Sequence, residues 1–331
     1  MLDRDALREE VRRSLLGSPP TLPPKLFYDH RGAQLFEEIT RLPEYYLTRT
    51  ETTILEASLP AIARRAGPGI HVVEFGSGSG EKTERLLEAL EAPRSYVPVD
   101  VAEEQLEEVA RRLDRAFPEV RIIPVAADYT RPLRLPVAEG RRLLFFPGST
   151  IGNFEPEEAV AFLRRAGRSL GQGAALLAGV DLVKPKAVLE AAYDDADGVT
   201  ASFNRNALEH LNRIAGTDFR PEAFAHRARW NADASRVEMH LVAEEEQSVT
   251  IPPPARSGTP ADPPGPDADA WRLELARGDH IVTEHSYKYT PEGWRALAGR
   301  AGWSFCEGWT DARSWFAVDY LEWRGTTDDD D

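Results

Sequence analysis

Hydrophobic and polar positions follow one rhythm between residues 71 and 180, where short apolar runs alternate with longer segments of helical periodicity. The apolar runs predict strands at residues 71–75, 95–99, 121–126, 142–146 and 174–180. The periodic segments predict helices at residues 81–91, 102–117 and 156–169. Strands that alternate with helices of this length form a parallel sheet with helices on both faces, so this region predicts a doubly wound α/β domain.

The segments on either side of this region have a different pattern. The N-terminal part predicts a helix at 3–16 and a second helix that is capped by Thr50 and ends near residue 66. Beyond residue 181 the pattern predicts helical residues 184–213, antiparallel strands within 223–251, an exposed Pro-rich loop at 252–270, a pair of strands at 271–275 and 280–289, a helix at 291–301, and final strands at 303–309 and 315–323. We expect a doubly wound domain of residues 59–183 and 287–331, and a second, discontinuous α+β domain of residues 1–58 and 184–286.

Composition narrows the choice of partners. The 331 residues include 40 basic and 55 acidic side chains, and this net charge of −15 argues against nucleic acid as a partner. A single cysteine, Cys306, excludes an internal disulfide and a thiolate zinc cluster, and the histidines lack zinc-site spacing, so we predict no metal. The charged N-terminus and the lack of an apolar run of ~20 residues predict a soluble cytoplasmic protein without membrane contact.

The strongest local motif is EFGSGSGEKT, which runs from Glu74 to Thr83 at the end of a predicted strand. A phosphate-binding P-loop needs glycine directly before Lys82, and a dinucleotide fingerprint needs its third glycine at the same place, where this chain has Glu81. A Gly-x-Gly-x-Gly turn after an acidic residue is the form used by doubly wound S-adenosylmethionine enzymes. The motif therefore favours S-adenosylmethionine, which has no pyrophosphate.

Further candidate residues follow the next predicted strands. Asp100 ends the second strand, where a carboxylate can accept hydrogen bonds from both ribose hydroxyls. Asp128 can accept from an adenine amino group while Tyr129 packs on the ring. After the fourth strand, Gly148 allows close backbone approach and Asn153 offers both a donor and an acceptor. For Asn153 alone, an Asx turn that leads into the next helix is the simpler interpretation.

Several longer motifs have the order and composition of one family. They are PPKLFYDHRG at 23–32, LPEYYLTRTE at 42–51, EFGSGSGEKT at 74–83, GSTIGN at 148–153, DLVK at 181–184, YDD at 193–195 and FNRN at 203–206. Over roughly residues 20–320 the chain resembles the histidine-specific N-α-methyltransferases of ergothioneine biosynthesis. The resemblance implies S-adenosylmethionine as cofactor and trimethylation of the α-amino group of L-histidine to hercynine. It also implies small-molecule partners, and we expect a monomer.

The resemblance implies roles for individual residues. Cofactor contacts fall on Tyr45, Gly76, Lys82, Asp100, Asp128 and Tyr129. Substrate contacts fall on Asn153 and Tyr193 at the carboxylate, on Tyr28, Phe36 and Gly148 around the reacting amine, on Met239 in a side pocket, and on Glu284 and Ser286 at the imidazole. The predicted catalytic residues are Tyr28, our candidate to pass on the amine proton, and Gly148, whose small size leaves room for added methyl groups. For residues 203–206 we expect that they order a domain junction rather than perform chemistry.

The spacing of Glu284 and Ser286 suits an imidazole, because residues two apart on a strand point to the same side. A carboxylate can accept from one ring N–H, and a hydroxyl can donate to or accept from the other nitrogen. Without the resemblance, an exposed strand face explains the pair equally well. The alternatives are an N-methyltransferase of another aromatic amino acid such as tryptophan, a nicotinamide-dependent oxidoreductase, and a catalytically silent binding protein.

Overall fold

The computed structural model describes residues 4–136, 139–252 and 271–325, and the chain divides into two compact units. Unit 1 consists of Met1–Glu44, Lys186–Asn231 and Val237–His285. Unit 2 consists of Tyr45–Pro185, Ala232–Arg236 and Ser286–Asp331. The predicted Pro-rich loop lies, except for Pro252, outside the described residues.

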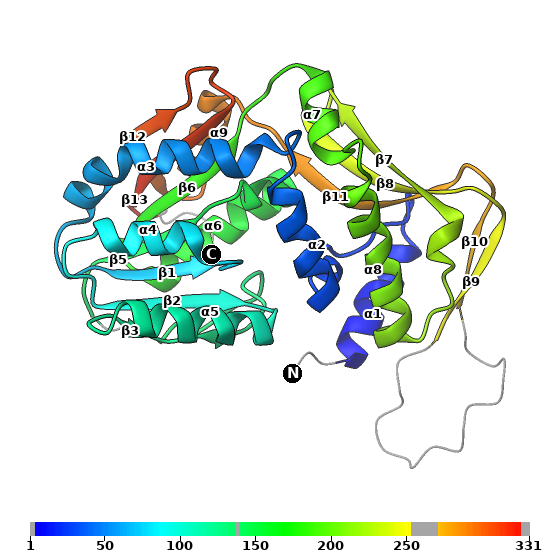
Figure 1. Ribbon diagram of the computed structural model, residues 1–331, viewed down its shortest axis with the longest axis horizontal. Helices are drawn as coiled ribbons and strands as arrows, with labels where there is room; N and C mark the ends of the chain where they lie inside the picture. Colours follow the sequence, from blue (N-terminus) through cyan, green and yellow to red (C-terminus); the bar gives the residue numbers. More distant parts are fainter. Residues whose placement is uncertain (1–3, 137–138, 253–270, 326–331) are drawn as a thin grey trace, which may run out of the picture. The chain divides into compact units, whose positions relative to one another are not determined.

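Among the described residues, a sheet of eight strands forms the centre of unit 2 (Figure 1). The strands are β1 (His71–Phe75), β2 (Ser95–Asp100), β3 (Arg121–Ile122), β4 (Val125–Ala126), β5 (Arg142–Phe146), β6 (Ala175–Asp181), β12 (Trp303–Thr310) and β13 (Phe316–Trp323). Their order is β12-β13-β6-β5-β1-β2-β3, and β4 also pairs with β2. Strands β1, β2, β5 and β6 are parallel, whereas β13 is antiparallel to both of its neighbours.

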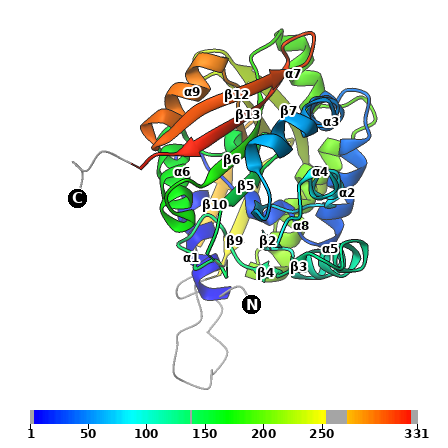
Figure 2. The ribbon, with the colours of Figure 1, turned by 90° about the vertical axis from the view of Figure 1, so that its left-hand side faces the viewer.

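Helices cover both faces of this sheet, as Figure 2 shows. One face carries α3 (Tyr46–Ala66), α4 (Glu81–Ala89) and α5 (Glu103–Ala116), and the other carries α6 (Pro156–Leu170) and α9 (Pro291–Arg300). Val73, Phe146, Phe162 and Trp294 belong to the apolar core on the side of α6 and α9. Every residue of β1 is buried, as expected for a parallel strand that is covered on both faces. The predicted doubly wound α/β architecture is confirmed.

The strand order determines where a ligand can bind in unit 2. β1 pairs with β2 on one side and with β5 on the other, so the direction of winding changes beside β1. In open α/β sheets, ligands bind outside the carboxyl ends of the strands at such a switch point. Gly76 follows β1, Asp100 is the last residue of β2, and Gly148 lies in the turn after β5.

Two boundaries of unit 2 differ from the prediction. The strand expected at 121–126 is divided into β3 and β4 at Pro124, which has no N–H to donate to β2. Thr50 does not cap a helix, because α3 begins earlier, at Tyr46. Tyr46 and Leu47 are both buried, so tertiary packing extends the helix beyond the capping signal.

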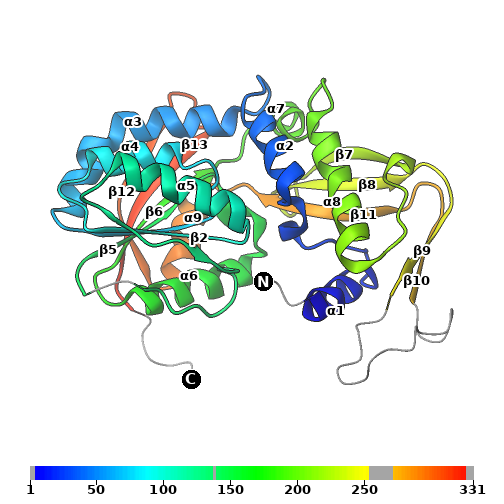
Figure 3. The ribbon, with the colours of Figure 1, turned by 60° about the horizontal axis from the view of Figure 1, so that its bottom comes forward.

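Unit 1 combines helices with short antiparallel sheets (Figure 3). Its helical elements are α1 (Arg4–Leu15), η1 (Pro24–Phe27), α2 (His30–Thr40), α7 (Lys186–Tyr193), α8 (Val199–Ala215) and η3 (Pro221–Ala223). Its strands are β7 (Phe224–Asn231), β8 (Arg236–Ala243), β9 (Gln247–Ile251), β10 (Trp271–Leu275) and β11 (His280–Tyr287). Strand β8 lies between β7 and β11, and β9 pairs with β10. Arg236 of β8 and the last two residues of β11 are assigned to unit 2.

The predicted pairing of residues 271–275 with 280–289 is wrong. β10 pairs with β9, from Trp271 opposite Ile251 onward, and β11 pairs with β8. The turn after β10 explains the change, because the Gly278 N–H donates to the carbonyl of Ala243 and the Ala243 N–H donates to the carbonyl of Asp279. These bonds direct β11 to the end of β8.

The compact units group residues 45–58 differently from the predicted domains. The sequence placed these residues with the α+β domain, whereas α3 belongs to unit 2 in the structure. The reason is its packing, because α3 lies against α4, β6 and β13. The assignment of one domain to the cofactor and the other to the substrate stays a prediction.

Candidate functional site

The turn between β1 and α4 carries glycines in the left-handed region of backbone space. The φ angles of Gly76, Gly78 and Gly80 are 77°, 50° and 72°, which residues with a Cβ rarely adopt. A Cβ at Gly80 would also lie 2.7 Å from Cγ1 of Val109 in α5. The path of the turn therefore depends on glycine, and the turn lies at the carboxyl end of β1, where a ligand is expected.

The first turn of α4 disfavours a phosphate ligand. Glu81 and Glu84 both lie there, at the helix end where the macrodipole attracts anions. Their carboxylates would repel a pyrophosphate at the place where dinucleotide-binding helices hold one. The helix start therefore agrees with the S-adenosylmethionine interpretation and opposes the nicotinamide one.

Asp100, at the end of β2, lies beside the glycine turn. Its Oδ1 accepts the N–H of Ala102 at 3.0 Å. Burial raises the pKa of this carboxyl, while backbone N–H groups, including those of Gly78 and Ser77 in the turn, act in the opposite direction. These contacts place the carboxylate next to the backbone that a ribose would approach.

Tyr129 and Asp128 complete this side of the site. The Tyr129 ring stacks on Phe75, with centroids 5.4 Å apart and planes within 5°, and its hydroxyl lies 3.8 Å from the position of a Cβ on Gly76. Burial raises the pKa of this phenol far above its usual range. Asp128 accepts the N–H of Thr130 at 2.9 Å in an Asx turn, which fixes its orientation. Gly76, Asp100 and Tyr129 are thus brought together as predicted.

Glu74, the acidic residue before the turn, is buried without an ion-pair partner among the described residues. The hydroxyl of Thr83 donates to its Oε2 at 2.6 Å, and the Tyr96 hydroxyl donates to the same oxygen. Burial raises the pKa of Glu74 to about 8, although both hydrogen bonds lower it. The carboxyl therefore keeps its proton at neutral pH.

Glu51, a buried residue of α3, contacts two of the predicted site residues. Its carboxylate oxygens each accept the N–H of Gly148 at 2.9 Å, and one of them forms an ion pair with Lys82. A Cβ at Gly179 in β6 would lie 1.8 Å from Oε1 of Glu51, so only glycine leaves room for this carboxylate. Glu51 therefore fixes both Lys82 and the Gly148 N–H.

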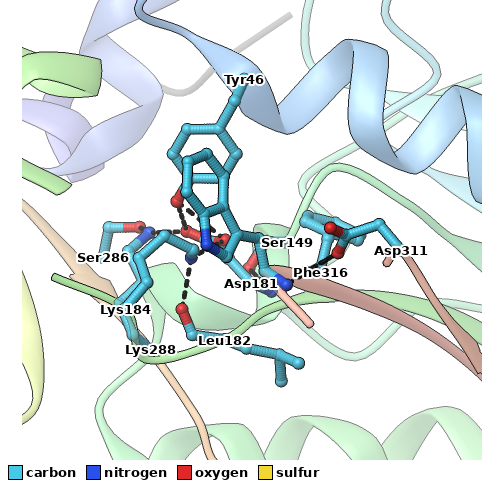
Figure 4. A network of polar contacts seen from close by, with 10 residues as sticks. Tyr46, Ser149, Asp181, Leu182, Lys184, Ser286, Lys288, Asp311 and Phe316 are labelled. Atoms are coloured by element: carbon cyan, nitrogen blue, oxygen red, sulfur yellow. Dashed lines mark hydrogen bonds and ion pairs between the residues drawn. The ribbon is translucent and has the colours of Figure 1, made fainter. Parts of the chain in front are cut away.

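Asp181, at the end of β6, is a second buried carboxylate and forms the centre of a polar network (Figure 4). It accepts the Tyr46 hydroxyl at 2.7 Å, Nζ of Lys184 at 2.6 Å and Nζ of Lys288 at 2.9 Å. Burial lowers the pKa of Lys184 to about 8, while Asp181 opposes this change. One carboxylate thus holds two lysines in a site closed to solvent.

The Asp181 network also reaches two predicted site segments. The N–H of Asp181 donates to Oγ of Ser149 at 2.9 Å, in the turn that follows Gly148. Nζ of Lys288 donates to Oγ of Ser286 at 2.8 Å (Figure 4). The orientation of Ser286 is therefore set by the lysine two residues further along the chain.

The turn with Asn153 packs against the end of β11. This turn is η2 (Thr150–Asn153), and a Cβ at Gly152 would lie 2.7 Å from the carbonyl oxygen of Tyr287. Asn153 is half-buried at the end of η2, and Tyr45 is buried directly before α3. Unit 2 therefore contains the predicted residues Tyr45, Gly76, Lys82, Asp100, Asp128, Tyr129, Gly148, Asn153 and Ser286.

In unit 1, an aromatic cluster surrounds two of the predicted substrate residues. Tyr28 contacts Phe36 edge-on at 5.7 Å and Phe203 at 5.9 Å, and Phe203 stacks on Phe27 at 4.6 Å. Asp29, the N-cap of α2, accepts the side-chain amide of Asn206 at 2.7 Å. The FNRN motif thus orders the segment with Tyr28 within unit 1, and its expected role at a domain junction stays a prediction.

Tyr193 and Met239 are buried in the same unit. The carbonyl of Tyr193, at the end of α7, faces Nε2 of His226 at 2.7 Å, and Nδ1 of His226 faces the amide of Asn204 at 2.8 Å. Burial lowers the pKa of His226, so the ring is neutral and structural. The carbonyl of Met239 accepts the Thr283 hydroxyl at 3.1 Å, which ties β8 to β11.

Glu284 and Ser286 lie on one side of β11, as their spacing predicts. Glu284 is half-buried and Ser286 is 3% exposed. The strand thus carries a carboxylate and a hydroxyl two residues apart, and Lys288 follows directly after its last residue. The polar neighbours that sequence reasoning missed are Glu51, Asp181 and Lys288. Polar residues at 284, 286 and 288 recur at every second position, and this pattern could have pointed to Lys288. The DLVK motif at 181–184 begins with Asp181 and could have pointed to that residue.

The described ranges contain no group of three or more His, Cys, Asp or Glu side chains that could hold a metal ion. In the same ranges, no helix has the length and apolar character that crossing a membrane requires.

A doubly wound sheet, a glycine turn without a phosphate-binding helix end and an acid after the second strand define a S-adenosylmethionine-dependent methyltransferase. The family model for histidine-specific, S-adenosylmethionine-dependent methyltransferases matches residues 7–323. The chain therefore belongs to this family, and its cofactor is S-adenosylmethionine.

Curated relatives agree with this assignment. The chain is 40% identical to the histidine N-alpha-methyltransferase of Mycolicibacterium smegmatis, over 95% of this chain and 94% of that protein. It is 29% identical to a 4-dimethylallyltryptophan N-methyltransferase of Claviceps purpurea, over 72% of this chain and 76% of that protein. A solved glycopeptide N-methyltransferase in complex with S-adenosyl-L-homocysteine gives a TM-score of 0.41 at 14% identity, over 81% of this chain and 86% of that one, which is too low to add to the argument.

Proposed function

We propose that this chain transfers three methyl groups from S-adenosylmethionine to the α-amino nitrogen of L-histidine and so forms hercynine for ergothioneine biosynthesis. The observation that carries the proposal is the histidine-specific family match over residues 7–323, and the order of Glu284 and Ser286 on β11 supports it. The Mycobacterium tuberculosis histidine N-alpha-methyltransferase, 40% identical over 95% of this chain, supports the same substrate.

The residues around the glycine turn fit the cofactor. Asp100 would hold the ribose hydroxyls, Asp128 and Tyr129 the adenine, and Gly76 would allow close approach of the cofactor. Lys82 and Tyr45 would also contact the cofactor. The carboxylates of the first turn of α4 suit a cofactor that carries a positive charge and no phosphate. When bound, the cofactor supplies the methyl group.

The protein must hold the substrate amine in its unprotonated form, because an ammonium group has no lone pair. Asn153 and Tyr193 would hold the substrate carboxylate, and Tyr28, Phe36 and Gly148 would surround the amine. Met239 would line a side pocket. The Tyr28 hydroxyl would pass on the amine proton. Orientation of the reacting groups can contribute ~7–11 kcal/mol to rate acceleration, so these contacts can act without a strong dedicated base.

The direct test is incubation with isotope-labelled S-adenosylmethionine and a panel of amino acids, read by mass spectrometry. We expect mono-, di- and trimethylated histidine in succession. Methylation of another amino acid and not of histidine would refute the substrate, and absence of transfer to any amine would refute the activity.

Replacement of Glu284 tests imidazole recognition. We expect Glu284→Ala to raise the KM for histidine ~10–100-fold, because a hydrogen bond to a charged group is worth ~1.5–3 kcal/mol. Cofactor affinity should stay within twofold of the original value. Glu274→Ala, at an exposed glutamate of β10, is the matched control and should change neither constant. Equal losses for histidine and cofactor would contradict the role of Glu284.

Replacement of Asp100 tests the cofactor site. We expect Asp100→Ala to weaken cofactor binding ~10–100-fold, measured by calorimetry, since it removes the acceptor proposed for the ribose hydroxyls. Asp114→Ala, at an exposed position of α5, is the control. If histidine binding alone suffers in Asp100→Ala, the glycine turn does not hold the cofactor.

A second candidate is N-methylation of a tryptophan-type amine, which the Claviceps purpurea relative favours. An indole has one N–H and no acceptor nitrogen, so it would engage Glu284 but would leave Ser286 without a ring acceptor. Comparison of kcat/KM for histidine and tryptophan decides between the candidates. We further propose a cytoplasmic monomer, which fractionation and light scattering would test.

A further inference from the structure

Ser286 is held by an ammonium group, and this restricts what its hydroxyl can offer a ligand. Nζ of Lys288 donates to Oγ of Ser286 at 2.8 Å, and both side chains are buried, at 2% and 3% exposure (Figure 4). An ammonium group has three donors and no acceptor, so Oγ must be the acceptor in this contact. The hydroxyl hydrogen of Ser286 therefore points to some group other than Lys288.

The ammonium group of Lys288 is itself fixed. It pairs with Asp181 at 2.9 Å, and Asp181 also binds Lys184 at 2.6 Å. One carboxylate thus balances two buried lysines, so the surroundings of Ser286 favour donation by its hydroxyl and oppose a second cation.

We propose that Lys288 is a positioning residue for substrate recognition, which makes Ser286 a hydrogen-bond donor and so selects the neutral imidazole ring. This inference rests on the proposed function of the Glu284–Ser286 pair. In the neutral ring, the N–H group donates a hydrogen bond to Glu284, and the unprotonated nitrogen accepts one from the hydroxyl of Ser286. An imidazolium ring would present a second N–H, and Ser286 could receive it only with its hydrogen turned away and with the charge of Lys288 close by.

Lys184 provides a matched control on the same carboxylate. It is also buried, with a side chain 1% exposed against 0% for Lys288, and it is paired with Asp181, but its second contact is the carbonyl of Leu182. Lys184→Met therefore removes one charge from the network and leaves the Lys288–Ser286 contact in place. Lys288→Met removes the same charge together with that contact.

The other titratable groups near Lys288 come from several segments. Tyr46 of α3 and Lys184 share its carboxylate partner, and Asp311, before β13, acts on Lys184. Glu284 and His285 precede Ser286 on the strand. Tyr46, Asp311, Glu284 and His285 remain in both lysine variants, and each variant loses one lysine from the same carboxylate, so a difference between the variants reports on the Ser286 contact.

The experiment is calorimetric titration of L-histidine into the full chain with S-adenosylhomocysteine present, from pH 5.5 to 8.5. The original chain should lose affinity about tenfold per pH unit below the imidazole pKa of ~6.5. Lys288→Met should bind histidine ~10-fold more weakly at pH 8 and lose less than threefold between pH 6.5 and 5.5. Lys184→Met should keep the original pH profile, and S-adenosylhomocysteine affinity should be unchanged in both variants, which shows that they are folded.

A double-mutant cycle with Ser286→Ala completes the test. If Lys288 acts through Ser286, Lys288→Met should change histidine affinity less than twofold when Ser286 is already alanine. The inference is overturned if Lys288→Met keeps the original affinity and pH profile, or if Lys184→Met causes the same change. An original chain that methylates another amino acid and does not bind histidine refutes the proposed function, and the inference fails with it. If the original chain methylates histidine, and Lys288→Met changes neither histidine affinity nor its pH profile, the inference is refuted while the proposed function stands.

Discussion

Two carboxyl groups are buried at the carboxyl ends of neighbouring parts of the sheet in unit 2, and the protein accommodates them in opposite ways. Glu74 receives hydrogen bonds from the hydroxyls of Thr83 and Tyr96, and its pKa is raised to about 8. Asp181 receives a hydroxyl and two ammonium groups. The first region holds a neutral acid beside the glycine turn, whereas the second holds a paired anion beside the end of β11, where Ser286 lies.

The two carboxyl groups differ in charge because they hold different partners in place. A protonated Glu74 can hold the strand end and α4 together without a charge that would interact with a cationic cofactor. A charged Asp181 can orient two lysines at once, and one of them orients Ser286. Burial alone therefore does not decide the charge of a carboxyl group, because the donors around it do.

The largest expected effect belongs to Asp181→Asn. The variant leaves two buried ammonium groups without their counter-ion, which should lower the free energy of unfolding by ~3–5 kcal/mol. Urea unfolding at pH 7 measures this loss. Glu74→Gln is the matched control, since it also neutralises a buried carboxyl group, and equal losses in the two variants would remove the contrast between the regions.

Glu74→Gln should change the pH dependence of stability. Between the unfolded pKa of 4.5 and the folded pKa of about 8, the native carboxyl keeps its proton while the unfolded one has lost it. The free energy of unfolding therefore falls as pH rises through this window, by up to ~1.4 kcal/mol per pH unit. The Gln variant lacks this pH dependence. Its free energy of unfolding, measured in urea, should therefore rise relative to that of the original chain from pH 5 to 8. Parallel stability curves would show that Glu74 is charged in the fold.

The smallest effect is expected for Ser149→Ala. The change removes the acceptor of the buried Asp181 N–H and should cost ~1–3 kcal/mol in urea unfolding. It leaves the ion pairs of Asp181 intact, so the pH dependence of stability should stay as it was. A loss as large as that of Asp181→Asn would mean that the turn, and not the ion pairs, holds this region together.

Much of unit 2 could be predicted from the sequence. The strands at 71–75 and 142–146 were found at their exact bounds, because buried parallel strands are continuous apolar runs between clear breaks. The glycine turn and Asp100 could be singled out because both lie within one strand–helix–strand unit, from β1 through α4 to the end of β2. The strand at 121–126 was only approximately predicted, since Pro124, which has no N–H to donate, divides it into β3 and β4.

Long-range partners could not be predicted in this way. The pairing of β10 with β9 depends on the turn at Ala243, and the start of α3 at Tyr46 depends on burial. Glu51 lies far in sequence from Lys82 and Gly148, and no local pattern says that one carboxylate will meet both.

The sequence by itself determined the doubly wound fold and the family, because hydrophobic periodicity and contiguous motifs depend on residues that are close together in the chain. Only the tertiary structure decided that Asp181 holds Lys184 and Lys288, and that Lys288 holds Ser286. The physical reason is that a buried charge is stabilised by whichever groups the fold brings within hydrogen-bond distance, and that distance is set by packing rather than by sequence separation.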